Sequence, residues 1–217
     1  MTLNIDPSTT LVFDLDDTLY KEIDFLKSAY RQIAQHLNAK DWRATYAVMF
    51  ALYREKKNVF DQISKKFKVE IESLLTIYRN HNPDIILKAE TKLLLDHIKS
   101  KGANITLLTD GRSITQRNKI RALGLETWMD KVFISEELGS EKPSENNFMA
   151  VENHYKTLTY CYIADNLKKD FITPNKRGWK TIGLIDNGLN MHVDSVSYER
   201  PEYLPQRFIF NLQELLS

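Results

Sequence analysis

The sequence predicts an α/β fold, a Rossmann-like parallel sheet with helices on both faces, plus a small all-helical cap domain. Three observations predict it. A short apolar run at residues 10–13 ends in three closely spaced carboxylates. Residues 20–83 then show helical periodicity alone, with no candidate strand. From residue 84 onward, candidate helices of about ten residues alternate with short apolar strands, the pattern of a parallel sheet.

The first strand, residues 10–13, has the continuous apolar character of a strand that is buried on both faces. Asp14, Asp16 and Asp17 follow it at the carboxyl edge of the sheet, where ligands bind in open α/β folds. Three acids at one place repel one another and raise each other's pKa unless a cation lies among them. The simplest interpretation is a magnesium site.

The helical block contains four amphipathic stripes, with apolar residues recurring at steps of three and four. The last stripe ends before Pro83, because the residue that precedes a proline is disfavoured in the helical region. We therefore expect a cap at residues 20–83, inserted into a catalytic core of residues 1–19 and 84–217. The four stripes cover residues 23–37, 42–53, 60–67 and 71–78.

The remaining elements follow in alternation, and right-handed crossovers between them give a parallel sheet. The predicted helices cover residues 90–100, 113–123, 144–154 and 168–175, with a terminal helical turn at 212–216. The predicted strands cover residues 104–108, 131–134, 159–164, 181–184 and 207–210. Residues 186–206 contain two prolines and are expected to be irregular.

Composition narrows the class of protein. A formal net charge of +1 gives no general attraction to nucleic acid or to a membrane surface. The single cysteine, Cys161, excludes an internal disulfide framework and suits a reducing compartment. No leader-like amino terminus and no long apolar run are present, so we expect a soluble, cytoplasmic protein, a monomer or a homodimer, without a nucleic-acid or membrane partner.

Chemistry-bearing residues fall at or near several strand ends, which lie side by side in such a sheet. A carboxylate can attack phosphorus, and magnesium held by carboxylates offsets the charge of the phosphate. A lysine, a hydroxyl and the backbone amides of a glycine turn can hold the phosphate oxygens. The residues concerned are Asp14, Asp16, Thr109, Asp110, Gly111, Lys142, Asp165 and Asp170.

Four segments, in this order, resemble the motifs of the haloacid dehalogenase-like hydrolase superfamily, specifically its phosphatases. Residues 13–20, FDLDDTLY, resemble the first motif, D-x-D-x-T, and LTDG at 108–111 resembles the second. EKP at 141–143 is similar to the lysine motif, and IADNLKKD at 163–170 to the final acidic motif. One departure is Ala164, where the family usually has glycine, and this affects backbone fit rather than a chemical group.

The resemblance implies a role for each residue. Asp14 is then the nucleophile that becomes phosphorylated, and Asp16 the general acid and base. Asp14, Asp16 and Asp165 hold Mg²⁺, with the main-chain carbonyl of Asp16 as the family's usual contact. Asp170 supports the metal site or holds Lys142. The phosphate is bound by Thr109, Asp110, Gly111 and Lys142.

The position of the insertion resembles the helical cap of the subgroup that acts on small soluble phosphomonoesters. Tyr20, Lys21 and Glu22 lie at its hinge and are candidates for contacting the substrate, whether a nucleotide, a sugar phosphate or a similar compound. The expected function is a magnesium-dependent phosphatase that works through an aspartyl-phosphate. The alternatives are a phosphomutase with the same residues and a catalytically silent binding or regulatory protein of this fold.

Some of these residues also have a purely structural interpretation. Asp17 and Thr18 can form a turn and a helix cap, and Thr109 can cap the turn after its strand. Asp170 can be a surface acid beside two lysines. The five histidines show no metal-ligand spacing, so none is assigned to the site.

Overall fold

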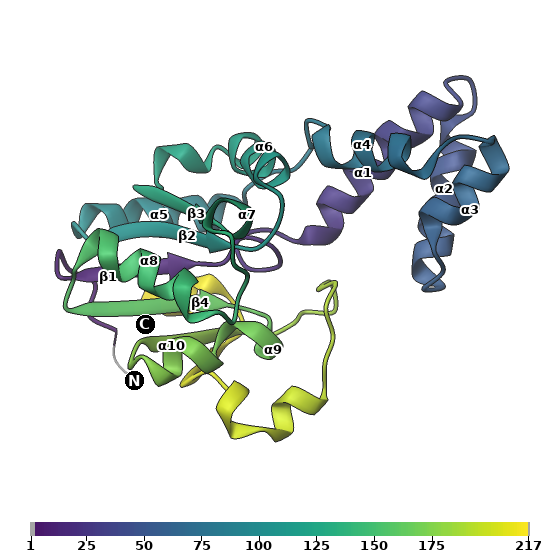
Figure 1. Cartoon of the computed structure of the whole chain (residues 1–217). Coiled ribbons are helices and arrows are strands. Elements are labelled where there is room, and N and C mark those ends of the chain that lie inside the picture. Colours follow the sequence, from purple (N-terminus) through teal and green to yellow (C-terminus); the bar gives the residue numbers. More distant parts are fainter. Residues whose placement is uncertain (1–2, 217) are drawn as a thin grey trace.

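The computed structural model describes residues 3–216 and contains a six-stranded, all-parallel sheet in the order β3-β2-β1-β4-β5-β6 (Figure 1). The central strand, β1, pairs with β2 on one side and β4 on the other, and Phe13 lies opposite Leu107 and Ile163. The carboxyl ends of these three strands therefore meet at one edge. The strands are β1 Thr9–Phe13, β2 Asn104–Thr109, β3 Lys131–Ile134, β4 Thr159–Ala164, β5 Lys180–Leu184 and β6 Arg207–Ile209.

Both faces of the sheet are covered, as the sequence predicts. Every residue of β1 is buried, and its side chains alternate between two apolar cores. Leu11 and Phe13 pack with α5 Ala89–Ser100, α6 Ser113–Leu123 and the terminal η4 Leu212–Leu216. Val12 packs on the other face with α8 Glu145–Tyr155 and α9 Leu167–Asp170. The sheet thus holds β1 rigidly, and with it the residues that follow it.

Four helices between β1 and α5 form a separate unit that projects beyond the sheet (Figure 1). They share a core of their own, in which Ile33, Met49, Ile63 and Leu74 are almost fully buried. All four predicted helices are confirmed in this block. They are α1 Glu22–Leu37, α2 Trp42–Arg54, α3 Val59–Phe67 and α4 Ile71–Asn80.

The prediction of a single helix at residues 168–175 is wrong in one respect. The structure has two short helices there, α9 and α10 Ile172–Lys176. Pro174 has no amide hydrogen to donate to the Asp170 carbonyl four residues earlier, and its ring clashes with that carbonyl. The predicted irregular segment 186–206 also contains two short 3₁₀ helices, η2 Val196–Glu199 and η3 Pro201–Tyr203. Two further short elements are η1 Leu125–Thr127 and α7 Ser135–Leu138.

Within residues 3–216, no helix combines the length and the apolar character that crossing a membrane requires.

Candidate active site

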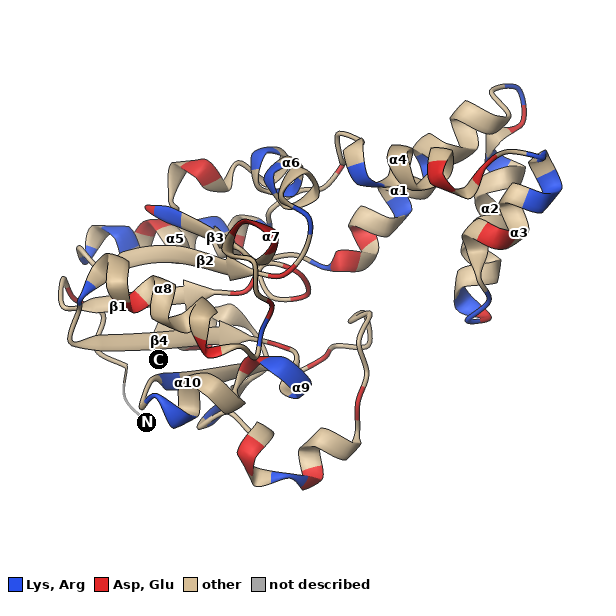
Figure 2. Ribbon diagram, in the orientation of Figure 1, with Lys and Arg blue, Asp and Glu red and all other residues tan. Residues whose placement is uncertain are grey.

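A cleft of about 120 Å³ opens at the carboxyl edge of the sheet, between the core and the start of α1. Basic and acidic segments meet at this edge, where α9 lies (Figure 2). Residues far apart in sequence line the cleft because the ends of β1, β2 and β4 are adjacent. The lining residues are Asp14, Asp16, Asp17, Glu22, Thr109, Asp110, Asp165, Asn166, Lys169 and His192.

Lys142 forms a buried ion pair with the carboxylate of Asp14. Its side chain is fully buried, and its ammonium group lies 2.7 Å from Asp14 and 2.8 Å from Asp170. The third donor direction is filled by the Tyr162 hydroxyl oxygen at 2.8 Å. Burial opposes the charge on Lys142, but Asp14 and Asp170 outweigh that effect and raise the pKa of the lysine well above its ordinary value.

Asp14, Asp165 and Asp170 form an acidic cluster in which one carboxylate oxygen of each residue lies within 4.8 Å of the other two. Asp14 and Asp170 are buried, and Asp165 is partly buried. Burial raises the pKa of Asp14 to about 6, against the opposing effect of Lys142. Burial, with repulsion from Asp14 and Asp170, raises the pKa of Asp165 to about 9. Lys142 is in ion-pair contact with Asp14 and Asp170 but not with Asp165, so this donor set of oxygen atoms fits a hard divalent cation such as Mg²⁺.

Asp16 follows Asp14 by two residues, yet its carboxylate belongs to a different network. Lys119 donates to it at 2.7 Å, the Tyr20 hydroxyl at 2.5 Å and the Gln116 side-chain amide at 2.9 Å. Burial raises the pKa of Asp16, but the charge and hydrogen bond of Lys119 more than reverse this, so that the net shift is downward. The carboxylate cluster contains Asp14 and Asp165 of the predicted metal set. The metal contact predicted for Asp16 is its main-chain carbonyl, which is separate from the carboxylate held by Lys119, and it stays a prediction.

Of the four predicted phosphate-binding residues, Thr109 and Asp110 line the cleft, whereas Gly111 and Lys142 are not among its lining residues. The Thr109 hydroxyl is within 2.9 Å of the Gln116 amide and faces the cleft. The carboxylate of Asp110 accepts from the Lys142 backbone amide and from the Lys169 ammonium. The backbone amide of Gly111 was predicted to bind a phosphate oxygen. In the structure it donates to the Ser135 hydroxyl at 2.9 Å.

Asp17 has the structural role that the sequence allowed for it. Its backbone has a positive φ of 59°, a conformation that aspartate tolerates better than most residues. Its carboxylate accepts from the backbone amide of Glu22, the first residue of α1, and from that of Met191. Asp17 thus joins the start of the helical unit to the loop that follows β5. Thr18 lies beside it, with its hydroxyl 3.5 Å from Asp165.

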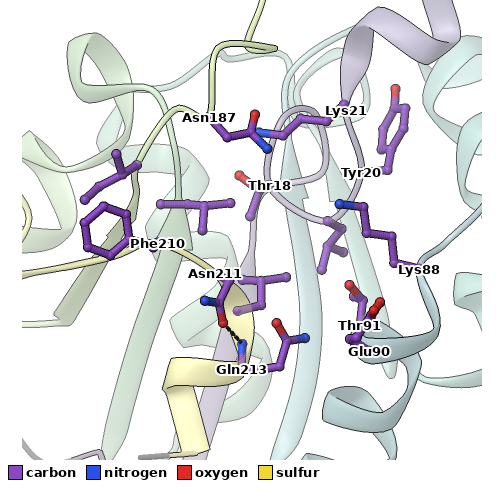
Figure 3. Close-up of a pocket in the computed structure, with 14 residues that line it drawn as sticks. Thr18, Tyr20, Lys21, Lys88, Glu90, Thr91, Asn187, Phe210, Asn211 and Gln213 are labelled. Atoms are coloured by element: carbon purple, nitrogen blue, oxygen red, sulfur yellow. Dashed lines mark hydrogen bonds between the residues drawn. The ribbon is translucent and has the colours of Figure 1, made fainter.

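The three predicted hinge residues divide between two cavities. Glu22 lines the cleft of about 120 Å³, whereas Tyr20 and Lys21 line a neighbouring pocket of about 260 Å³ (Figure 3). Lys88 closes that pocket from the segment that leads back into the core, and Asn211 lies at its base (Figure 3). Burial, with repulsion from Asp16, raises the pKa of Glu22 to about 7.

Contact between the loop after β5 and the site was not predicted from the sequence. Asn190 donates to Asp165 at 2.8 Å and accepts from Lys21 at 2.5 Å. His192, two residues later, also lines the cleft, although no histidine was assigned to the site from the sequence. Periodicity carries no signal here, because residues 186–206 have neither helical nor strand pattern.

Three donors on helices were also missed. Gln116 and Lys119 lie one turn apart on α6, and both are buried. Lys169 on α9 lines the cleft and bonds to Asp110 at 3.0 Å. The available signal is that Gln116 and Lys119 occupy positions on the sheet-facing side of a predicted helix, where an apolar residue is the norm.

A parallel sheet with paired carboxylates, a buried lysine and a hydroxyl at its carboxyl edge defines an α/β enzyme with a carboxylate centre. The chain belongs to the haloacid dehalogenase-like hydrolases, since the model of that family matches residues 11–184. The family predicted from the four motifs is confirmed.

Curated proteins that the chain resembles in sequence are named as phosphatases. The chain is 27% identical to glyceraldehyde 3-phosphate phosphatase of Methanocaldococcus jannaschii, over 81% of this chain and 84% of that one. It is 25% identical to the protein of the same name from Pyrococcus furiosus, over 89% and 90%. A ribulose-1,5-bisphosphate 5-phosphatase of Halopiger xanaduensis is 27% identical over 46% of this chain and 42% of its own.

Solved structures share the fold. A magnesium-bound HAD hydrolase, YfnB of Bacillus subtilis, superposes with a TM-score of 0.68 at 22% identity, covering 95% of this chain and 96% of that one. A β-phosphoglucomutase-like protein of Thermotoga maritima gives a TM-score of 0.66 at 15% identity, covering 96% of each chain. At these identities the likeness concerns the architecture alone.

Proposed function

We propose that this protein is a magnesium-dependent phosphatase that hydrolyses a small sugar phosphate through an aspartyl-phosphate on Asp14. One observation carries the proposal. Asp14 and Asp16 are two residues apart, yet Lys142 holds the first and Lys119 the second. Two carboxylates in separate electrostatic environments suit two separate tasks, nucleophilic attack and proton transfer.

In the first step, a carboxylate oxygen of Asp14 attacks phosphorus and the bond from phosphorus to the ester oxygen breaks. Lys142 orients Asp14, and its positive charge favours the ionised form that the attack requires. The negative charge of the bound phosphate opposes the effect of Lys119 and raises the pKa of Asp16, which favours its protonated form. In that form Asp16 gives its proton to the departing ester oxygen, which leaves as an alcohol. Thr109 and Lys169, which line the cleft, are placed to hold the phosphate oxygens.

In the second step, Asp16 takes a proton from a water molecule, and the resulting hydroxide attacks the phosphorus of the aspartyl-phosphate. The bond between Asp14 and phosphorus breaks, inorganic phosphate leaves, and Asp14 is again a carboxylate. Asp16 is again protonated, so the pair returns to its starting state after one hydrolysis.

Asp14 and Asp165 would hold Mg²⁺, with Asp170 behind them and the Asp16 carbonyl as a further oxygen donor. When bound, the cation offsets the negative charge that the phosphate and the attacking carboxylate bring together. Asn190 donates to Oδ2 of Asp165 at 2.8 Å, and the Thr18 hydroxyl lies 3.5 Å from Oδ1. This fixes the orientation of the carboxylate, as hydrogen-bonding partners of metal ligands commonly do.

The helices of residues 20–83 act, in this proposal, as a cap over a core of residues 1–19 and 84–217. The unit joins the core through two segments only, and its first helix begins at Glu22, in the wall of the cleft. A cap at this place excludes water during the first step and supplies contacts to the alcohol part of the substrate.

Sugar phosphates of three to five carbons are the substrate class with most support. The relatives that carry a named activity act on glyceraldehyde 3-phosphate or ribulose 1,5-bisphosphate by their names. A cleft of about 120 Å³ with acidic and amide side chains at its rim suits a small hydroxylated group. Asn166 and His192 supply polar atoms for its hydroxyls.

A panel of phosphomonoesters, assayed for released phosphate with Mg²⁺, tests the proposal. We expect the highest kcat/KM for triose and pentose phosphates, and lower values for nucleotides. Conversion of a sugar phosphate into an isomer, without free phosphate, would instead show a phosphomutase. No turnover of any compound would favour a binding protein of this fold.

A further inference from the structure

Lys119 is a buried cation that is separate from the predicted motifs. Only 4% of its side chain is exposed, and its ammonium group lies 2.7 Å from Asp16 and 3.7 Å from Glu22. The same group lies 4.4 Å from the ring centre of Phe25 on α1. Within residues 3–216, Asp16 and Glu22 are the carboxylates in ion-pair contact with it. A buried lysine of this kind is costly unless it is paired.

The carboxylate of Asp16 is fixed through both oxygen atoms. Lys119 and the Tyr20 hydroxyl donate to Oδ1, and the Gln116 amide donates to Oδ2. Gln116 also lies within 2.9 Å of the Thr109 hydroxyl and within 2.6 Å of the Asp110 carbonyl. Since Gln116 and Lys119 are one turn apart on α6, that helix ties the position of Asp16 to the end of β2.

We propose that Lys119 is a positioning residue for Asp16, the group that protonates the departing oxygen. Each of the two carboxylates then has its own buried lysine. Lys142 pairs with Asp14, and Lys119 pairs with Asp16 and keeps it away from the acidic cluster. The inference rests on the proposed function, because it concerns the proton transfer of that reaction. Lys119 itself exchanges no proton; the proton moves from Asp16 to the ester oxygen as the bond to phosphorus breaks.

This role has a consequence that a purely structural ion pair does not share. An alkoxide leaving group needs the proton of Asp16, whereas a nitrophenolate leaves readily without it. Displacement of Asp16 therefore slows the hydrolysis of an alkyl phosphate far more than that of p-nitrophenyl phosphate. A general disturbance of the cleft slows both esters alike. The ratio of the two rates distinguishes the two roles.

The test compares Lys119→Met with the wild type on glycerol phosphate and p-nitrophenyl phosphate, both with saturating Mg²⁺. We expect kcat/KM to fall by about 10²-fold for the alkyl ester and by less than about tenfold for the aryl ester. Asp16→Asn provides the reference, and its ratio of losses should be at least as large. Lys119→Arg, which restores the cation, should recover most of the alkyl-ester activity.

Arg117→Met is the matched control. It lies on the same helix, and its ion pair with Glu137 is half-exposed, so both esters should react at wild-type rates. Should Lys119→Met fail to fold by circular dichroism, Lys119→Gln takes its place, since its shorter uncharged side chain cannot maintain the contact with Asp16. The same selective loss is expected, with a smaller ratio.

Equal losses for the two esters in either Lys119 variant, or no loss in either, would overturn the inference while the wild type remains a phosphatase. If the wild type releases phosphate from neither ester nor any sugar phosphate, the proposed function itself fails. The two failures are therefore distinguishable by the wild-type assay alone.

Discussion

The ammonium group of Lys142 lies 2.7 Å from the carboxylate of Asp14, across 128 residues of sequence. The same ammonium group also lies 2.8 Å from the carboxylate of Asp170. Asp14 follows β1 and Asp170 ends α9, the helix after β4, so the parallel register of β1 and β4 brings these two carboxylates together. Lys142 reaches both from the connection between α7 and α8. The stability and the chemistry of the site both depend on this contact.

Asp14→Asn removes the nucleophile and keeps the side-chain volume. We expect turnover of any phosphomonoester to fall on the order of 10³-fold or more, because an amide does not attack phosphorus. Far-ultraviolet circular dichroism should be unchanged, since Lys142 keeps Asp170 as a partner. Asp24→Asn, in an exposed ion pair on α1, is the control that should retain activity. Substantial phosphate release by the Asp14 variant would contradict the assignment.

Lys142→Met leaves Asp14 and Asp170 buried without their cation. We expect the free energy of unfolding, measured with urea, to drop by about 3–5 kcal/mol. The double variant Lys142→Met with Asp170→Asn should recover part of that loss, because one unpaired charge is removed. Lys65→Met, which breaks an exposed pair with Asp61, should change stability by less than about 1 kcal/mol. A Lys142 variant as stable as the wild type would argue against a buried charge network.

Chelation of divalent ions should abolish phosphate release, and added Mg²⁺ should restore it. Mg²⁺ should also raise the thermal midpoint, because binding to the native state at 100 times Kd adds about 2.7 kcal/mol of stability. Asp165→Asn should lose most of this response. An enzyme that turns over at full rate in excess chelator would refute the metal assignment.

Mg²⁺ binding should strengthen as pH rises toward 9. Burial and its acidic neighbours raise the pKa of Asp165 from 3.8 to about 9, so a proton competes with the cation below that pH. In metal-free protein, the native state binds this proton more tightly than the unfolded chain does. Its stability should therefore fall as pH rises from about 4 to about 9. Urea midpoints across this range, with and without Mg²⁺, measure both effects.

A histidine outside the reaction site gives a pH effect of opposite sign. His81, at the end of α4, is buried, donates from Nδ1 to the Tyr78 carbonyl, and packs against the ring of Phe25. Burial lowers the pKa of His81 below its ordinary value of 6.5. The unfolded chain thus binds a proton more readily, and stability should fall as pH drops below about 6.5.

His81→Asn keeps a donor for the Tyr78 carbonyl and cannot become protonated. The urea midpoint of this variant should change less between pH 7.5 and pH 5 than that of the wild type. An identical acid dependence in both proteins would show that another group is responsible.

Three of the motif residues were predictable because each lies at the end of a strand of recognisable pattern. Asp14, Thr109 and Asp165 come directly after apolar runs, and adjacent parallel strands place such residues together whatever the helices do. The four helices of the inserted unit were predictable for a similar reason, since their apolar stripes have helical period. The division between α9 and α10 was missed, although Pro174 was there to indicate it.

Lys119 and Gln116 were not predictable in the same way. Both occupy a side of a core helix where an apolar residue is the norm, but nothing in their spacing identifies the Asp16 carboxylate as their partner. Asn190 and His192 lie in a segment without periodicity, whose path depends on bonds such as that from the Met191 amide to Asp17.

The sequence by itself determined the class of fold, the family and the identity of the carboxylates, because strand patterns and short motifs are local properties of the chain. Only the tertiary structure decided which charged partners surround each of the two carboxylates of the first motif, Asp14 and Asp16. Asp14 joins Asp165, Asp170 and Lys142, whereas Asp16 joins Lys119. The reason is physical: a buried charge is stabilised by whichever opposite charge the packing brings within about 3 Å, and the order of residues along the chain does not specify that partner.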